Sequence, residues 1–297
     1  MFSGLSAFSL TPTNETGIDE AAFVRLIERL AVANVDSIGT LGSTGNYAYF
    51  TLSERLRVTQ LAVQHAGNTP VIVGIGALRT RDVLDLAEGA QAAGASAVLL
   101  APISYQKLSD NEVFSLYETV TRNLSVPLCV YDNPGMTHFE FSDQLHGRIA
   151  HLPNVCSIKI PGVTVDPIAA KARVERLRVL IPSHVTIGIS GDYFAATGLS
   201  AGCEVWYSVI GGLFPKVALA ITRAAQAGDI QEATRLSKRL QSLWIFSSQH
   251  GGSLRVIASA AVLLGLVEQD CLPLPLKTLE GADLQQLAEL IDELALA

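Results

Sequence analysis

Eight short apolar runs alternate with amphipathic stretches of helix length along most of this chain. The runs cover residues 6–10, 36–41, 70–75, 95–101, 126–131, 155–160, 185–189 and 204–209. The stretches between and after them predict helices over 19–33, 51–65, 80–93, 109–123, 142–151, 165–177, 194–199 and 215–227. Strands joined by helical crossovers are parallel, and eight such units close into a barrel. The pattern therefore predicts an α/β fold, a (β/α)8 TIM barrel.

The pattern changes after Gly228, where apolar runs of strand type no longer occur. Residues 229–249, 253–264 and 282–296 have helical periodicity. We therefore expect two parts, a (β/α)8 barrel over 1–228 and a C-terminal extension of three helices over 229–297.

Composition and charge narrow the class of protein. The net charge is −7, which argues against a nucleic-acid partner. The longest apolar run, residues 257–267, is too short to span a membrane, and the first ten residues lack the pattern of a secretory signal. The four cysteines are scattered and form no CxxC pair. We expect a cytoplasmic protein with reduced thiols and no membrane partner.

A single lysine interrupts the apolar run 155–160. The run reads VCSIKI, and a charge inside a strand buried on both faces is costly. Lys159 therefore reaches water where the strand ends, is paired, or is held for chemistry. The first of these is the more common fate of such a lysine, so the choice depends on the residues that join it.

Polar and small residues follow several of the predicted strands. Active sites of barrels lie at the C-terminal ends of the strands. There the sequence places Gly42–Gly45 (GSTG), Tyr131, the pair Gly191 and Asp192, and Ser208. No cluster of His, Asp and Glu with metal-ligand spacing occurs among them, so we expect no metal.

A strand-end amine beside a tyrosine and a glycine loop suits one reaction type. A neutral Lys159 amine can attack a ketone to form a Schiff base, and flanking isoleucines favour the neutral form by desolvation. The Tyr131 phenol can both donate and accept the protons of that reaction. Backbone N–H groups of Gly42 and Gly45, with the hydroxyls of Ser43 and Thr44, can hold a carboxylate. The set indicates an α-keto acid substrate, although the glycine segment taken alone is equally typical of an ordinary turn.

Taken together and in order, these motifs resemble the dihydrodipicolinate synthase / N-acetylneuraminate lyase superfamily of Schiff-base-forming aldolases. The resemblance rests on Thr11-Pro12, Gly42–Gly45, Tyr131–Pro134, Ile158-Lys159 and Gly191-Asp192. It implies that Lys159 forms the Schiff base, without a further cofactor, and that Tyr131 transfers protons. It also implies that Ser43 and Thr44 bind the carboxylate and that Tyr105 reaches into a neighbouring subunit's site. Dimers or tetramers, most simply a homotetramer, are implied as well.

The chain departs from that family where the second substrate would bind. The synthases carry an arginine two residues after the proline of the Tyr-x-x-Pro motif, and here that position is Met136. His138 is the nearby alternative ligand, and Gly191, Asp192 and Ser208 complete the expected substrate-binding set. Apolar residues at 136, 139, 193, 206 and 207 either form an apolar distal pocket, suited to an uncharged aldehyde, or pack in the core or an interface.

The leading hypothesis is a pyruvate-type class I lyase or synthase that makes or breaks a C–C bond next to a 2-keto acid through Lys159, with an aldehyde as partner. A 2-keto-3-deoxy sugar-acid dehydratase on the same scaffold shares the first step. The non-enzymatic alternative is a paralogue that binds keto acids without turnover. An aldolase of phosphorylated substrates would need basic groups after the last two strands, where the sequence offers only Lys216, close after Gly211-Gly212.

Overall fold

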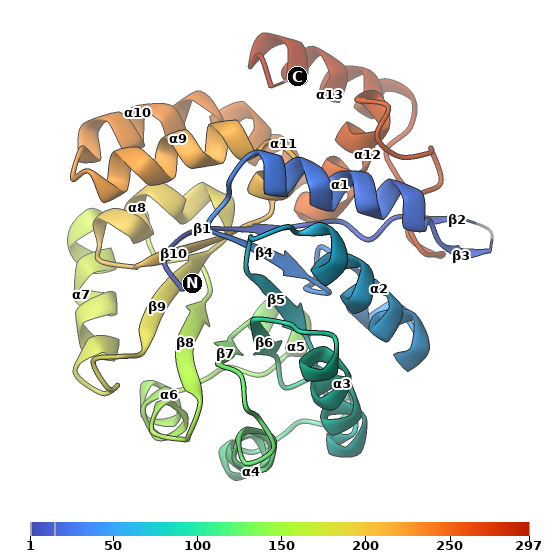
Figure 1. The fold of residues 1–297 in the computed structure, drawn as a ribbon. Coiled ribbons are helices and arrows are strands. Elements are labelled where there is room, and N and C mark those ends of the chain that lie inside the picture. The colour runs from blue at the N-terminus through green and yellow to red at the C-terminus, as the bar shows by residue number, and fades with distance from the viewer. Residues whose placement is uncertain (1, 15, 297) are drawn as a thin grey trace.

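Eight parallel strands form a closed barrel in the computed structural model, which describes residues 2–14 and 16–296. The strand order around the barrel is β1-β10-β9-β8-β7-β6-β5-β4, so neighbours in the chain are neighbours in the barrel (Figure 1). The predicted barrel is confirmed. The strands are β1 Gly4–Phe8, β4 Ser37–Thr40, β5 Val71–Gly74, β6 Ala97–Leu100, β7 Leu128–Tyr131, β8 Val155–Ile160, β9 Thr186–Ser190 and β10 Val205–Ser208.

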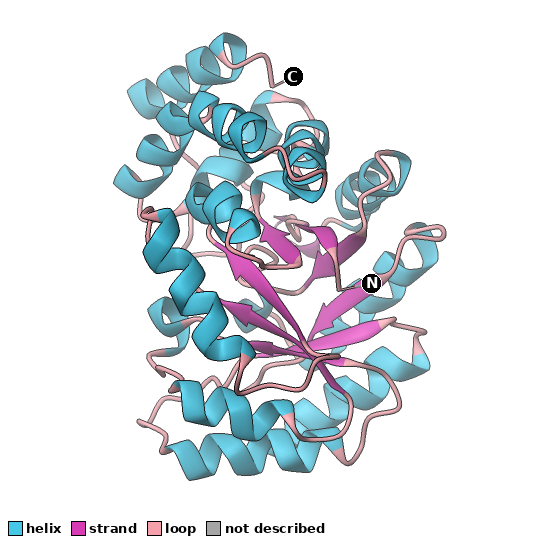
Figure 2. Ribbon diagram, turned by 90° about the vertical axis from the view of Figure 1, so that its left-hand side faces the viewer, coloured by secondary structure: helices cyan, strands magenta, loops and turns pink. Residues whose placement is uncertain are grey.

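Helices follow the strands and surround the barrel (Figure 2). Two of them begin with a capping box, in which Thr51 pairs with Glu54 and Ser109 pairs with Glu112. The crossover helices are α1 Glu20–Val32, α2 Leu52–His65, α3 Thr80–Ala92, α4 Asp110–Thr121, α6 Asp143–Ala150, α7 Pro167–Arg178, α8 Ala195–Ser200 and α9 Pro215–Gln226.

The C-terminal part, as described up to residue 296, contains four helices where three were predicted. They are α10 Ile230–Arg239, α11 Gln241–Gln249, α12 Ser253–Leu263 and α13 Gly281–Glu293. The expected helix 229–249 is divided at Leu240, whose φ of −91° and ψ of 9° leave the helical range. The Trp244 indole N–H donates to the Ser237 carbonyl across this break, 3.3 Å away. Because α10 packs against α8 and α9, the division into 1–228 and 229–297 stays a prediction. None of the described helices is long and apolar enough to cross a membrane.

Several short elements follow the strands at the C-terminal end of the barrel and were not predicted. Helix α5 Pro134–Thr137 follows β7, and the 3-10 turns η1 Tyr47–Tyr49, η2 Asp192–Phe194 and η3 Ile210–Gly212 follow β4, β9 and β10. A hairpin of β2 Thr13–Asn14 and β3 Gly17–Ile18 follows β1. Elements of two to four residues are too short to show a hydrophobic period.

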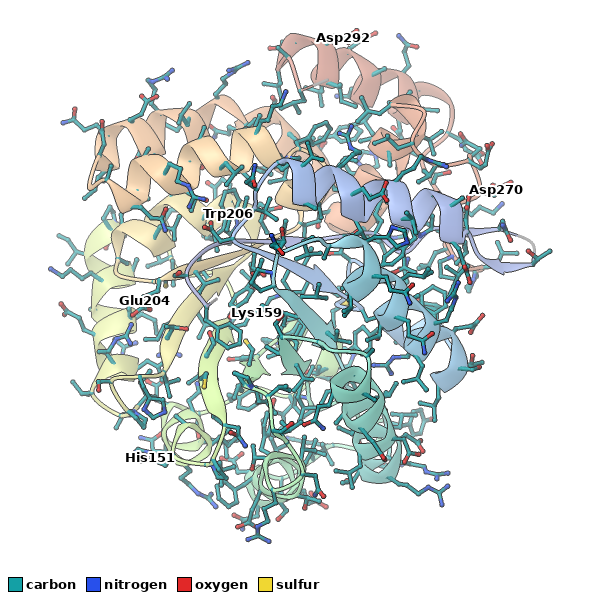
Figure 3. All side chains as sticks on the ribbon, viewed as in Figure 1. His151, Lys159, Glu204, Trp206, Asp270 and Asp292 are labelled. Carbon is teal, nitrogen blue, oxygen red and sulfur yellow. The ribbon has the colours of Figure 1, made fainter. Side chains whose placement is uncertain are left out.

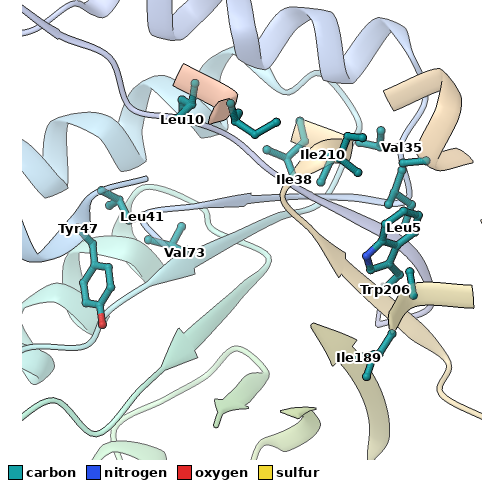
Figure 4. Close-up of a cluster of buried hydrophobic side chains, with 14 of the residues drawn as sticks. Leu5, Leu10, Val35, Ile38, Leu41, Tyr47, Val73, Ile189, Trp206 and Ile210 are labelled. Carbon is teal, nitrogen blue, oxygen red and sulfur yellow. The ribbon is translucent and has the colours of Figure 1, made fainter. Parts of the chain in front are cut away.

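Two apolar layers hold the barrel, because successive residues of a strand point to opposite faces. Outward-facing side chains such as Leu5, Ile189 and Trp206 pack between the strands and the helices (Figure 4). Inward-facing side chains such as Phe8, Tyr131 and Tyr207 fill the interior. The Tyr207 ring requires a glycine on β9, because a Cβ atom at Gly188 would lie 2.2 Å from Tyr207 Cε2. The interior is therefore packed with aromatic rings.

Candidate active site

Lys159 lies inside the barrel and is the second-to-last residue of β8. Its side chain is buried, with 4% of the residue exposed, and Figure 3 shows it near the centre of the ring of strands. Lys159 is in register with Tyr131 on β7, and the Asp132 N–H donates to the Lys159 carbonyl at 3.0 Å. The interpretation in which the lysine reaches water at the strand end is therefore wrong.

Three aromatic rings surround the Lys159 amine. The Nζ atom lies 4.0 Å from the Phe8 ring centre, 4.1 Å from that of Tyr131 and 5.4 Å from that of Tyr207. Within the described residues, no carboxylate forms an ion pair with this amine. The second possible fate of a buried lysine, a salt bridge, is thus absent there, and ring faces take the place of a counter-ion.

Two polar groups contact the Tyr131 hydroxyl at the C-terminal end of the barrel. The Ser43 hydroxyl lies 3.1 Å from it, and the side-chain amide of Asn133 donates to it at 2.9 Å. The fold therefore brings together three residues that the sequence singles out separately, Lys159, Tyr131 and Ser43. Asn133 joins them without having been singled out. It stands only two residues after Tyr131 within the Tyr-x-x-Pro motif, which was the available signal.

A second hydroxyl cluster lies inside the barrel beside the amine. The Tyr207 hydroxyl is 2.7 Å from Ser157 Oγ and 3.2 Å from Cys129 Sγ. Burial raises the pKa of the Cys129 thiol to about 11 and that of Tyr207 well above its ordinary value. Both groups are therefore neutral near pH 7, and the thiol is held as a packing and hydrogen-bonding group.

The glycine loop after β4 approaches the Phe8 ring at Gly42. A Cβ atom at Gly42 would lie 2.7 Å from Phe8 Cδ1, so this glycine lets an aromatic ring approach the loop. Gly45 donates its N–H to the Gly42 carbonyl at 3.0 Å, which closes the turn. Thr44 is buried, with 4% exposed. The segment is thus both a tight turn and a part of the wall around Lys159.

Asp192 and Ser208 use their polar atoms within the protein. The Asp192 carboxylate accepts from Trp206 Nε1, Ser208 Oγ and the N–H groups of Val209 and Ile210, at 2.8 to 3.1 Å. Ser208 Oγ also accepts from the Gly211 N–H at 2.8 Å. This arrangement ties η2 to the end of β10, and Gly191 supports it by adopting a φ of +81° at the start of the turn.

The remaining predicted site residues lie at the rim. Tyr105 is 92% exposed, and it lines a cavity of about 270 Å³ together with His138. Met136, on α5, is 65% exposed. The rim residues are thus separate from the buried set around Lys159.

The five apolar residues considered for a distal pocket do not form one. Trp206 points outward into the helix-facing core, whereas Tyr207 points into the barrel. Tyr193 lines a groove between α7, α8, α10 and α11. Phe139 packs edge-on against Phe141 at 5.0 Å. The sequence could not separate these positions, because neighbouring residues on a buried strand face different layers. No group of three or more His, Cys, Asp and Glu side chains able to hold a metal occurs in residues 2–14 and 16–296.

Comparison with known proteins agrees with this geometry. The model of the dihydrodipicolinate synthetase family matches residues 1–294. A 4-hydroxy-tetrahydrodipicolinate synthase of Hyphomonas neptunium is 30% identical over 273 residues, covering 89% of this chain and 90% of the relative. The crystal structure of a dihydrodipicolinate synthase from Agrobacterium tumefaciens is 42% identical, with a TM-score of 0.94 and coverage of 99% and 98% of the two chains.

A third similar structure is a prophage protein of E. coli K12 that belongs to the dihydrodipicolinic acid synthase family and was solved in complex with pyruvate. It is 25% identical with a TM-score of 0.90, and the match covers the whole of both chains. The expected resemblance is confirmed over nearly the full length. The chain belongs to the dihydrodipicolinate synthetase family and is a lyase of the class I aldolase type.

Proposed function

We propose that the protein makes or breaks a C–C bond next to a 2-keto acid such as pyruvate, through a Schiff base on Lys159. The observation that carries this proposal is a buried lysine amine, without a carboxylate partner in the described chain, beside a tyrosine hydroxyl. The pyruvate complex of the E. coli relative supports the same class of substrate. No metal or cofactor enters the proposal, because the amine itself activates the ketone.

The steps follow from the residues at hand. The neutral Lys159 amine attacks the ketone carbon and Tyr131 protonates the oxygen. The resulting phenolate takes a proton back from the attacking nitrogen, which gives a neutral carbinolamine and restores the phenol. Loss of water leaves an iminium, whose adjacent carbon then loses a proton or a C–C bond to give an enamine. In this proposal Ser43, Thr44 and the Gly42 N–H hold the substrate carboxylate, because the Gly45 N–H is already donated to the Gly42 carbonyl. Asp192 and Ser208 hold the β9 and β10 ends in place.

The partner is proposed to be an uncharged aldehyde. Met136 is exposed at the rim, where the family resemblance places an arginine that binds a second carboxylate. A methionine offers no cation there. We therefore expect weak turnover of aspartate semialdehyde, and a kcat/KM for it above that for simple uncharged aldehydes would overturn this part. Tyr105 is exposed at the rim, and its expected reach into a neighbouring subunit's site stays a prediction. The oligomeric state stays a prediction as well.

The test of the Schiff base is borohydride reduction with pyruvate, followed by intact mass and peptide mapping. We expect one pyruvate-sized adduct on Lys159, absent in Lys159→Ala. Lys171, exposed on α7, offers the matched control, because Lys171→Ala should keep the adduct. Folded wild-type protein that gives no adduct with pyruvate or with longer 2-keto acids contradicts the lyase proposal and favours a binding protein.

A further inference from the structure

Asn133 occupies the N-cap position of α5, yet its side chain does not cap the helix. Asparagine at this position ordinarily accepts a hydrogen bond from the first turn. Here the side-chain amide instead donates to the Tyr131 hydroxyl at 2.9 Å. Helix α5 forgoes a stabilising cap, so the amide has another use.

We propose that Asn133 is the positioning residue that fixes Tyr131 as a proton donor, within one chain. This inference rests on the Schiff-base function proposed above. An amide N–H can only donate, so it fills one acceptor position of the phenol oxygen. The phenol's own proton is then left for Ser43, at 3.1 Å, or for a substrate oxygen.

The same N–H serves the step in which the proton leaves. When the Tyr131 proton passes to the oxygen of the carbinolamine, the C–O bond breaks, water departs, and the Lys159 nitrogen lone pair completes the C=N bond. The electrons of the O–H bond remain on the phenol oxygen as a phenolate. The Asn133 amide then donates to an anion, and hydrogen bonds to charged groups are about twice as strong as neutral ones. Asn133 thus stabilises the phenolate more than the phenol.

The Asn133 contact is made within one chain and is separate from the contact that the family resemblance implies for Tyr105 of a neighbouring subunit. Among the residues that the structure describes, the partners of the Tyr131 hydroxyl are Ser43 and Asn133. Tyr105 is 92% exposed on a loop at the rim of its own chain.

Two variants separate donation from mere packing. Asn133→Asp keeps the shape but can only accept as a carboxylate, and Asn133→Leu removes the interaction. The probe is pyruvate in D2O, whose methyl protons exchange each time the iminium and enamine interconvert. We expect exchange to slow by about 10- to 100-fold in Asn133→Leu, and by more in Asn133→Asp, since a hydrogen bond to an anion is lost. The amount of adduct trapped at equilibrium should change little, because Asn133 acts on proton transfer.

The controls make each outcome decisive. Asn68→Asp and Asn68→Leu make the same changes in an exposed turn before β5, at the opposite end of the barrel, and should exchange like wild type. Wild type without any Lys159 adduct would remove the function itself. An adduct on wild type together with normal exchange in both Asn133 variants would overturn the role of Asn133 alone. An equal fall in exchange and in equilibrium adduct would also overturn it, because that indicates a general disturbance of the site.

Discussion

Asp132, between Tyr131 and Asn133, predicts an unusual dependence of stability on pH. Its residue is 4% exposed, and its Oδ2 atom lies 3.4 Å from Nε2 of the fully buried His146 on α6. Asp132 Oδ1 and both ring nitrogens of His146 have no hydrogen-bond partner among the described residues. Although the distance satisfies a salt bridge, this geometry and burial favour a neutral pair.

Burial moves the two titrations in opposite directions. It raises the pKa of Asp132 to about 7, an effect that Arg173 opposes and Glu140 reinforces. It lowers the pKa of His146 to about 3, with help from Arg173. Between about pH 4 and 7 the folded state keeps a proton on Asp132 that the unfolded state has lost, so this group's contribution to stability falls as pH rises. Between about pH 3 and 6.5 the unfolded state binds a proton that folded His146 does not, so the contribution of His146 rises with pH.

The two contributions to the pH dependence of stability nearly cancel in the wild type. Asp132→Asn removes the contribution of Asp132, so that of His146 should become visible. The asparagine amide mimics the neutral acid and does not titrate. Relative to wild type, the free energy of unfolding of this variant should rise by about 4 kcal/mol from pH 4 to 7, at about 1.4 kcal/mol for each of three pH units. Urea unfolding at a series of pH values measures the difference directly. Asp85→Asn, which removes an exposed carboxyl on α3, is the control.

The trend between pH 4 and 7 tests the burial argument. A carboxyl that is ionised in both the folded and the unfolded protein above about pH 4 contributes no change in stability over this range. Equal pH dependence in the two proteins would therefore refute the burial argument.

Three further predictions concern the interior of the barrel. Tyr207→Leu removes one of the rings beside Lys159, so the yield of pyruvate adduct trapped with cyanoborohydride should fall by about 2- to 5-fold, whereas Tyr207→Phe keeps the ring and should change the yield less. Gly188→Ala places a methyl group 2.2 Å from Tyr207 Cε2, and denaturation should show a loss of about 1–3 kcal/mol; an unchanged midpoint would mean that the ring moves freely. Lys159→Met should raise the melting temperature while abolishing the pyruvate adduct. A lower melting temperature would contradict the view that the buried amine destabilises the folded state.

The sequence predicted the barrel and much of the site because both follow from where strands end. Lys159, Tyr131 and Ser43 each stand at the C-terminal end of a predicted strand, and a closed parallel barrel brings those ends together. Asn133 was not predicted because its contact with the Tyr131 hydroxyl depends on helix α5. This helix has only four residues and is too short to show a hydrophobic period. Phe8 and Tyr207 were missed as neighbours of the amine because β1 and β10 are apolar on both faces, so the sequence does not say which residues point inward.

The break at Leu240 shows a different limit. Residues 229–249 have continuous helical periodicity, and the sequence there contains no proline or glycine to mark an end. The helix is interrupted where Leu240 is buried and the Trp244 indole bonds to the Ser237 carbonyl. The burial of Leu240 depends on tertiary packing, which local propensity does not encode.

The position of Lys159 argues that selection for chemistry, and not for stability, placed it there. Removing a charged amine from water costs several kcal/mol, and removing it without a carboxylate partner forgoes the attraction that offsets this cost. A ring face contributes only about 0.5–2 kcal/mol each to holding a cation. The three rings therefore offset only part of the free-energy cost of burying the ammonium. The fold is least stable when Lys159 is charged and no substrate is bound. A neutral amine avoids the desolvation cost, and a substrate carboxylate bound nearby would supply the counter-charge that the chain itself leaves out when the iminium forms. The same apolar enclosure thus accepts the cationic intermediate together with its anion, which is the differential stabilisation that catalysis requires.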